Sequence, residues 1–293
     1  MSNKILAFFV WVCLLLEACN QPVTISNKSV LVSDTAIRAH LIPAKTIETG
    51  YRALRDKDSI RHLLKEFGTQ FNIILAINRT DTQHIVIMDS VLIPSNLTAG
   101  VNSYSPFPQS IPYSNIKKII FFSYTAEYFA AYENGRLVRS GPTNMGREKD
   151  PTPTGVFYTN WKGADVKSSF NDEWDLKWNF NIINDSGIGF HQYAMPGYPA
   201  SHSCLRLNAD DAQYLYNWAD EWKIKGKANV IAQGTPVVVF GMYPFGSAKP
   251  WWQLLQDPHA IDISVAAIKQ VTDTAINGIL AEQERRIATS ETK

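Results

Sequence analysis

The chain is organised around Gly189-Phe190-His191-Gln192-Tyr193-Ala194-Met195-Pro196-Gly197-Tyr198-Pro199-Ala200-Ser201-His202-Ser203-Cys204-Leu205-Arg206-Leu207. Glycines and prolines interrupt this stretch after its first histidine, which predicts a loop rather than a regular strand or helix. The loop carries a thiol, two imidazoles and a guanidinium, which together indicate a nucleophile with a base and an anion-binding group. The alternative is that the cysteine is a small buried core residue and that the histidines are polar residues without a catalytic role. Both a structural cysteine and structural histidines would then have to occur together on one loop.

The segment from Pro196 to Leu207 resembles the active-site signature of the L,D-transpeptidase catalytic domain of the YkuD type. That signature contains a first histidine, a spacer and then Ser-His-Gly-Cys-x-Arg. His191 corresponds to the first histidine and Cys204 to the cysteine, whereas Ser203 replaces the family's glycine. Glycine is the usual residue where φ is positive, so a serine forced into that conformation is expected to cost about 1–2 kcal/mol, which the fold can absorb.

The resemblance implies a role for each residue of the motif. Cys204 is the expected nucleophile, and His191 is the expected acceptor of its proton, because an ordinary thiol is mostly protonated at neutral pH. His202 and Ser203 are expected to shape the loop and the oxyanion site, where backbone N–H groups would stabilise the developing charge. Arg206 is expected either to orient the loop or to bind a substrate carboxylate.

Three further residues are candidates for substrate binding: Ser201, Tyr193 and Trp178. Trp178 lies in residues 157–189, a segment in which aromatic side chains alternate with polar ones without clear periodicity. The position of this segment corresponds to the loop that caps the active site in the family. The segment is therefore expected to be either a lid that contacts substrate or a surface segment that packs locally and has no contact with substrate.

By resemblance, the acyl donor is a tetrapeptide stem of peptidoglycan that ends in D-Ala. Cys204 would form a thioester with the third residue, and an amine of a second stem would accept the acyl group; with water as acceptor, the protein would be an L,D-carboxypeptidase. The alternatives from other classes are an inactive peptidoglycan-binding lipoprotein and a zinc site at His191, His202 and Cys204. A fourth zinc ligand is not evident, so we expect no metal and no cofactor.

The N-terminus predicts export. Lys4 precedes an apolar run at residues 5–16, which has the length of a signal-peptide core and is short for a membrane span. Leu16-Glu17-Ala18-Cys19 resembles a bacterial lipobox, in which Cys19 is lipidated and becomes the first mature residue. Ordinary signal cleavage nearby and an uncleaved anchor are the alternatives. The expected location is the cell envelope, facing the periplasm or the outside, with a lipid holding the protein to a membrane.

The cysteines indicate a reactive thiol independently of the resemblance. Cys13 lies in the expected signal peptide and Cys19 would be acylated, which leaves Cys204 as the unmodified thiol of the mature chain. Exported thiols are usually paired, so an unpaired one indicates reactivity. The net charge of +1, without long runs of like charge, gives no indication of a nucleic-acid partner.

Residues 47–96 resemble a small, degenerate α/β LysM module, and this resemblance implies binding to the glycan strands of peptidoglycan. A helix is expected where apolar residues repeat with helical spacing before a glycine: Ile60, Leu63, Leu64, Phe67 and Gly68. Asn78, Arg79 and Pro94 match later positions of the module. The alternative is a small packing domain without a ligand.

The catalytic region is expected to be mainly β. Residues 116–124 and 127–132 are rich in β-branched and aromatic side chains. Asn134-Gly135 then predicts a hairpin, because both central residues of the tight turn need positive φ. Thr152-Pro153-Thr154-Gly155 leads into another strand and residues 234–240 form a closing strand, so the resemblance implies a β-sandwich.

Helices are expected after the active-site loop. Residues 209–222 have one apolar face, and Asn208 can cap their N-terminus. An apolar stripe from Ile261 to Ile279 predicts a C-terminal helix that packs either on the catalytic domain or on a partner.

The length of 293 residues suits about two domains. Residues 95–114 contain several prolines and serines, which is typical of a linker or an extended crossover. The predicted organisation is a signal peptide (1–18), a tether (19–46), a LysM-like module (47–96), a linker (97–115), a catalytic domain (116–242) and a C-terminal helical extension (243–293).

Overall fold

An Asn-Gly turn sets the register of the central sheet. The computed structural model describes residues 47–291 except 67, 168–174 and 227. Asn134 and Gly135 have φ values of 49° and 74°, as the predicted hairpin requires, and join β4 (Tyr128–Glu133) to β5 (Arg136–Pro142). A Cβ atom on Gly135 would lie 2.6 Å from the carbonyl oxygen of Ile111, so the turn also needs glycine for space.

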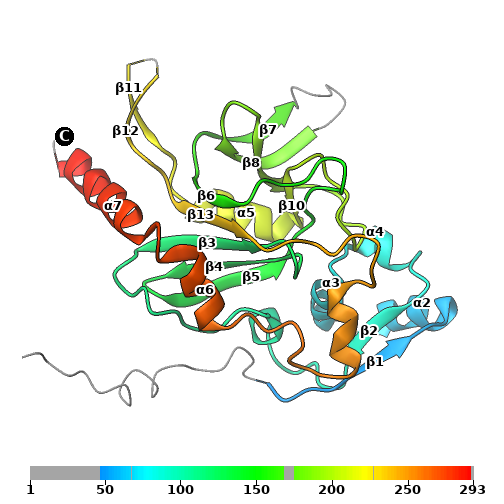
Figure 1. Cartoon of the computed structure of the whole chain (residues 1–293). Coiled ribbons are helices and arrows are strands. Elements are labelled where there is room, and N and C mark those ends of the chain that lie inside the picture. The colour runs from blue at the N-terminus through cyan, green and yellow to red at the C-terminus, as the bar shows by residue number, and fades with distance from the viewer. Residues whose placement is uncertain (1–46, 67, 168–174, 227, 292–293) are drawn as a thin grey trace, which may run out of the picture. The chain divides into compact units, whose positions relative to one another are not determined.

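Two sheets form the β-sandwich that the sequence predicts (Figure 1). The first has the order β5-β4-β3-β13-β6, and β13 pairs parallel to β3 and antiparallel to β6. Its other strands are β3 (Lys118–Ser123), β6 (Gly155–Tyr158) and β13 (Pro236–Phe240). The second sheet has the order β10-β9-β8-β7. Its strands are β7 (Lys162–Lys167), β8 (Asp175–Ile183), β9 (Ile188–Gln192) and β10 (Leu205–Leu207).

The main core lies between the two sheets. Phe122 of β3 stacks on Phe190 of β9 with the ring centroids 6.1 Å apart, and both side chains are fully buried. Helix α5 (Ala209–Trp218) packs against this core through Ala212 and Leu215. Asn208 caps α5 as predicted, because its side-chain oxygen accepts from the backbone N–H of Asp211 at 2.9 Å. The helix ends four residues before the expected end at 222.

Two C-terminal helices cover the outer face of the five-stranded sheet. Helices α6 (Val265–Thr272) and α7 (Ile276–Glu291) follow the 3₁₀ turn η3 (Pro250–Leu255). Ile268 and Ile279 pack against Phe121 and Tyr132 on that face. The predicted C-terminal helix is therefore confirmed, although the apolar stripe spans two helices, and it packs on the catalytic domain.

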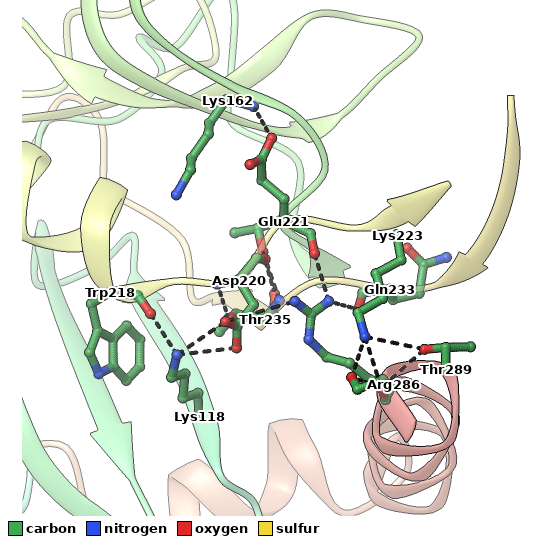
Figure 2. A network of polar contacts seen from close by, with 12 residues as sticks. Lys118, Lys162, Trp218, Asp220, Glu221, Lys223, Gln233, Thr235, Arg286 and Thr289 are labelled. Carbon is green, nitrogen blue, oxygen red and sulfur yellow. Dashed lines mark hydrogen bonds and ion pairs between the residues drawn. The ribbon is translucent and has the colours of Figure 1, made fainter. Parts of the chain in front are cut away.

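Polar contacts fix α7 to the hairpin of β11 (Lys223–Lys225) and β12 (Asn229–Ala232) (Figure 2). Arg286 donates to the carbonyl oxygens of Glu221 and Gln233 at 2.6 and 3.2 Å. Lys118 of the central sheet donates to the Trp218 carbonyl at 2.7 Å and lies 3.2 Å from the carboxylate of Asp220. The end of α5, the hairpin and α7 are thus held in one polar network.

The N-terminal region is mixed α/β, as expected. Its elements are β1 (Tyr51–Leu54), α2 (Lys57–Glu66), η1 (Gly68–Gln70), α3 (Phe71–Asn78), α4 (Thr82–Ile85) and β2 (Val91–Pro94). Strands β1 and β2 pair antiparallel. Asn78 joins α3 to β2, because its side chain donates to the Leu92 carbonyl and accepts from the Leu92 N–H, both at 2.8 Å. Ile60 is fully buried, and the side chains of Leu63, Leu64 and Phe67 lie outside the described part.

The segment predicted to be a linker or an extended crossover packs closely on the sandwich. It contains η2 (Val101–Tyr104), and its side chains Phe107, Ile111 and Tyr113 are buried in the cluster on the outer face. The N–H of Ile111 donates to the Gly135 carbonyl at 2.8 Å. All the described residues belong to one compact unit.

The expected signal peptide, Cys19 and the tether lie in residues 1–46, outside the described residues. Across residues 47–291, with the gaps given above, no helix is long and apolar enough to cross a membrane.

Candidate active site

The register of two parallel strands gathers the reactive side chains on one face. Arg206 of β10 lies opposite His191 of β9, and Leu205 lies opposite Phe190. Leu205 and Phe190 are fully buried in the sandwich core. Because side chains alternate along a strand, His191 and Arg206 point to the other face, and Cys204 follows the same alternation at the start of β10.

The backbone fixes the protonation state of His191. Its Nδ1 atom lies 2.9 Å from the carbonyl oxygen of Gln192, and a carbonyl can only accept, so Nδ1 carries the proton and Nε2 keeps its lone pair. The side chain is 3 % exposed. Burial lowers the pKa of His191 to about 4, and the nearby charge of Arg206 acts in the same direction. His191 is therefore a neutral base at neutral pH.

Cys204 is a partly exposed free thiol. Burial raises the pKa of Cys204 above its ordinary value, whereas the backbone N–H of Gly189 and the charge of Arg206 act to lower it. The thiol is thus protonated at rest, and the imidazole on the same strand face is neutral. This pair favours proton transfer during attack over a preformed thiolate–imidazolium pair.

A tight turn leads into Cys204. The Ser201 hydroxyl donates to the Cys204 carbonyl at 2.5 Å, and Ser201 is only 1 % exposed. Ser203 has a φ of 75°, the left-handed conformation that its replacement of glycine predicts. Thr152 donates to the Ser203 carbonyl at 2.9 Å, and the Ser203 hydroxyl donates to the Asp150 carbonyl at 3.2 Å. The hydroxyls of Ser201 and Ser203 therefore hold the turn.

The remaining candidates lie in different surroundings. The Nε2 atom of His202 is 4.0 Å from the Asp150 carboxylate, and this imidazole is 41 % exposed. The guanidinium carbon of Arg206 lies 4.6 Å from the centroid of the Tyr193 ring, and its Nη1 donates to the Ala194 carbonyl at 3.3 Å. Arg206 and Tyr193 thus form one stacked pair beside His191.

Trp178 makes its aromatic contact with α5. It has a φ of 55° at an irregular point in the pairing of β8 with β9. Its ring centroid is 5.3 Å from that of Tyr216 in α5, and it packs against the sandwich core. The described part of the predicted lid consists of β7 and β8 with the residues that flank them, and residues 168–174 lie outside the description.

A cavity of about 950 Å³ with a mixed polar and apolar lining adjoins the site on the side of Tyr193. Its lining comes from both the catalytic and the N-terminal regions, and includes Asp81, Arg139, Lys177, Tyr193 and Asp210. Within the described residues, no group of three or more His, Cys, Asp and Glu side chains is arranged to hold a metal ion.

The sequence motifs did not indicate the roles of two further residues at the site. The Gln192 carbonyl acts through the backbone, so no side-chain pattern indicates it. Thr152 belongs to the Thr-Pro-Thr-Gly sequence, which matches a recurrent element of the family but gives no indication of a role for this hydroxyl. Its hydroxyl both accepts from the Gly146 N–H at 2.8 Å and donates to Ser203, so it joins the hairpin region to the catalytic turn.

Comparisons with known proteins match the middle of the chain. The sequence model of the L,D-transpeptidase catalytic domain, YkuD, matches residues 117–239. L,D-transpeptidase 2 of Mycobacterium tuberculosis is 26% identical over 119 residues, which cover 35% of this chain and 29% of that protein. The match thus spans less than a third of the relative's own length.

Solved structures give weaker similarity. An L,D-transpeptidase from Stackebrandtia nassauensis is 22% identical with a TM-score of 0.36, and the match covers 44% of this chain and 57% of that one. An L,D-transpeptidase from Mycobacterium smegmatis is 20% identical with a TM-score of 0.34 and coverages of 43% and 59%. The sequence match thus makes residues 117–239 similar to the YkuD family of L,D-transpeptidase catalytic domains.

Proposed function

We propose that the protein is a cysteine-dependent L,D-transpeptidase that acts on the stem peptides of peptidoglycan. The observation that carries this proposal is the bond between His191 Nδ1 and the Gln192 carbonyl, on the same strand face as Cys204. That bond leaves a neutral Nε2 as a base for the thiol. The similarity of residues 117–239 to the YkuD family supports the choice of substrate class.

In the acylation step, the Cys204 sulfur attacks the carbonyl carbon of the third stem residue while its proton passes to His191 Nε2. The tetrahedral intermediate then collapses, the bond to D-Ala breaks, and the leaving amine takes the proton from His191. A thioester remains. In the second step, an amine of another stem attacks the thioester, gives its proton to His191, and releases the Cys204 sulfur, which regains that proton.

The turn before Cys204 supports an oxyanion site. A left-handed residue in a tight turn brings successive backbone N–H groups to one side, where they form a concave site for negative charge. Ser203 supplies this conformation. We assign the backbone N–H groups near His202, Ser203 and Cys204 to the developing oxyanion, and the Arg206 guanidinium to the loop or to a substrate carboxylate. Tyr193 and Trp178 remain proposed contacts for the stem peptide.

The expected location follows from the substrate. Peptidoglycan lies outside the cytoplasmic membrane, so we propose that the protein is exported and that a lipid on Cys19 anchors it. Cys19→Ser should release the protein from the membrane fraction or block its maturation. Unchanged membrane retention would point to an uncleaved apolar anchor instead. We further propose that the N-terminal region contacts glycan strands through exposed residues other than the buried Asn78 and Arg79.

The activity is tested by incubating the purified protein with peptidoglycan fragments that carry tetrapeptide stems. We expect release of D-Ala together with L,D-cross-linked dimers, detected by mass spectrometry. Cys204→Ala should abolish both products, and His191→Ala should lose most of the rate. Release of D-Ala without dimers would identify an L,D-carboxypeptidase. A folded wild-type protein that binds the fragments and converts none of them would favour an inactive binding protein and overturn the proposal.

A further inference from the structure

We propose that residues 79–81 of the N-terminal region position the active-site loop, and that Asp81 is a positioning residue for the reaction. The kinetic part of this inference rests on the proposed function. The structural part rests on two sets of contacts, one at the middle of the loop that joins His191 to Cys204 and one close to Cys204.

The three residues leave α3 in a direction set by its C-cap. Arg79 has a φ of 55°, and its backbone N–H donates to the Ala76 carbonyl at 3.3 Å, while the N–H of Thr80 donates to the Leu75 carbonyl at 3.1 Å. This is the usual left-handed ending of a helix, although glycine would be the common residue there. A conformation that costs about 1–2 kcal/mol for a residue with a Cβ atom persists only where other contacts stabilise it.

The first set of contacts holds the middle of the loop. The N–H of Met195 donates to Asp81 Oδ2 at 2.7 Å. The Met195 carbonyl accepts from the Asp81 N–H at 3.2 Å and from the Thr80 hydroxyl at 3.0 Å. Thr80 also pairs with Pro196 as an isolated antiparallel bridge. Both backbone polar groups of the fully buried Met195 are thus bonded to the N-terminal region.

The other oxygen of Asp81 is held by α4. Asp81 Oδ1 accepts from the backbone N–H groups of Gln83 and His84, each at 2.9 Å, and lies 2.7 Å from His84 Nδ1. One carboxylate oxygen therefore caps a helix while the other holds the loop. Since the cap fixes the carboxylate, the position of Met195 follows from the position of α4.

The loop also approaches this region closely at Gly197. A Cβ atom on Gly197 would lie 2.3 Å from Met88 Cε and 3.2 Å from the Asn78 carbonyl oxygen, and Gly197 has a φ of 80°. Glycine is needed there because the loop approaches the N-terminal region closely.

The second set of contacts reaches the part of the loop next to Cys204. Arg79 is 2 % exposed and donates through Nε to the Ala126 carbonyl at 2.9 Å. The next residue, Glu127, accepts from the Met145 N–H at 3.0 Å. The Met145 carbonyl in turn accepts from the N–H groups of Ala200 and Ser201, each at 3.1 Å. The loop near Cys204 is therefore held by Met145, which is linked to Arg79 through Glu127 and the neighbouring Ala126 carbonyl.

Loss of the Asp81–Met195 bond should misplace the catalytic groups without unfolding the protein. A displacement of about 1 Å at a reacting group lowers a rate by about 10²-fold. In Asp81→Asn, the amide oxygen can still cap α4, since asparagine is a good cap, but its NH₂ group then faces the Met195 N–H. We expect the rate of acylation by a carbapenem to fall by about 10- to 100-fold.

The experiment uses the full mature protein and three readouts. These are the rate of carbapenem acylation, the rate of alkylation by iodoacetamide, and hydrogen exchange of the amides of residues 193–203. Asp81→Asn should lower acylation, speed exchange in the loop, and leave alkylation within about threefold, because alkylation needs an accessible thiol rather than an ordered loop.

The matched control is Asp56→Asn. Asp56 Oδ2 accepts from the Ser59 N–H at 2.7 Å at the start of α2, which is the same kind of hydrogen bond in the same region. The Asp56→Asn substitution should affect none of the three readouts. Thr80→Val removes one bond to Met195 while it keeps the side-chain shape, and should produce a smaller change in the same direction. It replaces Asp81→Asn if that variant fails to fold.

Two results are decisive. The inference is overturned if folded Asp81→Asn shows the same loop exchange and the same acylation rate as the wild-type protein. If Asp81→Asn does not fold, the same result in Thr80→Val overturns it. If the wild-type protein itself is not acylated, the proposed function fails, and loop exchange alone decides: faster exchange in Asp81→Asn but not in Asp56→Asn would still support positioning by the N-terminal region.

Discussion

Ser203 is a serine in a backbone conformation that suits glycine. Its φ of 75° should cost about 1–2 kcal/mol, and its hydroxyl offsets part of that cost through the bond to the Asp150 carbonyl. One neutral hydrogen bond contributes about 0.5–1.5 kcal/mol, so the two effects nearly cancel. This near balance explains how the fold accommodates a serine beside the nucleophile.

Two variants of Ser203 separate these effects. Ser203→Ala keeps the strain and loses the hydrogen bond, so its free energy of unfolding should fall by about 1 kcal/mol. Ser203→Gly loses both, so its stability should stay within about 1 kcal/mol of wild type, with activity at least equal. Urea unfolding and acylation rates would measure this. A stable but slower Ser203→Gly would instead assign the hydroxyl a direct role with substrate.

The opposed pKa shifts of Cys204 and His191 predict the pH dependence of the thiol. Burial raises the pKa of Cys204 and lowers that of His191 to about 4, so neither group is charged near pH 7. The rate of alkylation by iodoacetamide should rise with pH in one step, above the ordinary cysteine pKa of about 8.5. Turnover should persist below pH 6, because His191 stays neutral until the pH approaches about 4. A plateau of high alkylation between pH 5 and 7 would indicate an ion pair and contradict this account.

At the scale of elements, the sequence predicted turns and helix caps correctly where one or two adjacent residues determine the backbone conformation. The Asn134-Gly135 turn and the Asn208 cap are both observed, because positive φ and side-chain capping depend on a few adjacent residues. The end of α5 and the break between α6 and α7 were not predicted, because no glycine or proline marks them. Asp220 instead accepts from Lys118, and such long-range contacts leave no local pattern.

The packing of α7 gives a prediction with a control on the same helix. Ile279 is 2 % exposed against the outer face of the sandwich, whereas Ile287 is 53 % exposed. Ile279→Ala should lower the free energy of unfolding by about 2–5 kcal/mol, and Ile287→Ala should change it by less than about 0.5 kcal/mol. Urea denaturation would measure both. Equal, small effects would mean that α7 is not held on the catalytic domain.

At the scale of the whole molecule, the described residues form one compact unit. Asn78 and Arg79 carried the resemblance to a glycan-binding module, yet both are 2 % exposed and bond within the protein. Glycan contact by the N-terminal region would therefore need other residues. Sequence could find the two side chains but not their partners, because Asn78 bonds to Leu92 on another element of the module and Arg79 bonds to Ala126 beyond it.

Arg79 should be essential for stability. Its guanidinium donates to the carbonyls of Ala126, Ala76 and Ile77, and lies 4.8 and 5.1 Å from the ring centroids of Tyr128 and Trp251. Arg79→Ala would leave buried carbonyls without donors, so the free energy of unfolding should fall by at least about 3 kcal/mol in urea titrations. Arg61→Ala, at an exposed ion pair in the same region, should change little. A small loss in Arg79→Ala would mean that the two regions are held together elsewhere.

The central claim is that Cys204, with His191 as its base, is a competent acyl acceptor. Intact-protein mass spectrometry after incubation with a carbapenem tests it most directly, because the strained cyclic amide acylates the nucleophile without any second substrate. The account predicts that the wild-type protein gains the mass of one carbapenem, that peptide mapping locates it on Cys204, that His191→Ala gains it far more slowly, and that Cys204→Ala gains none. A folded wild-type protein that gains no mass, or a Cys204→Ala variant that gains the same mass, would contradict it.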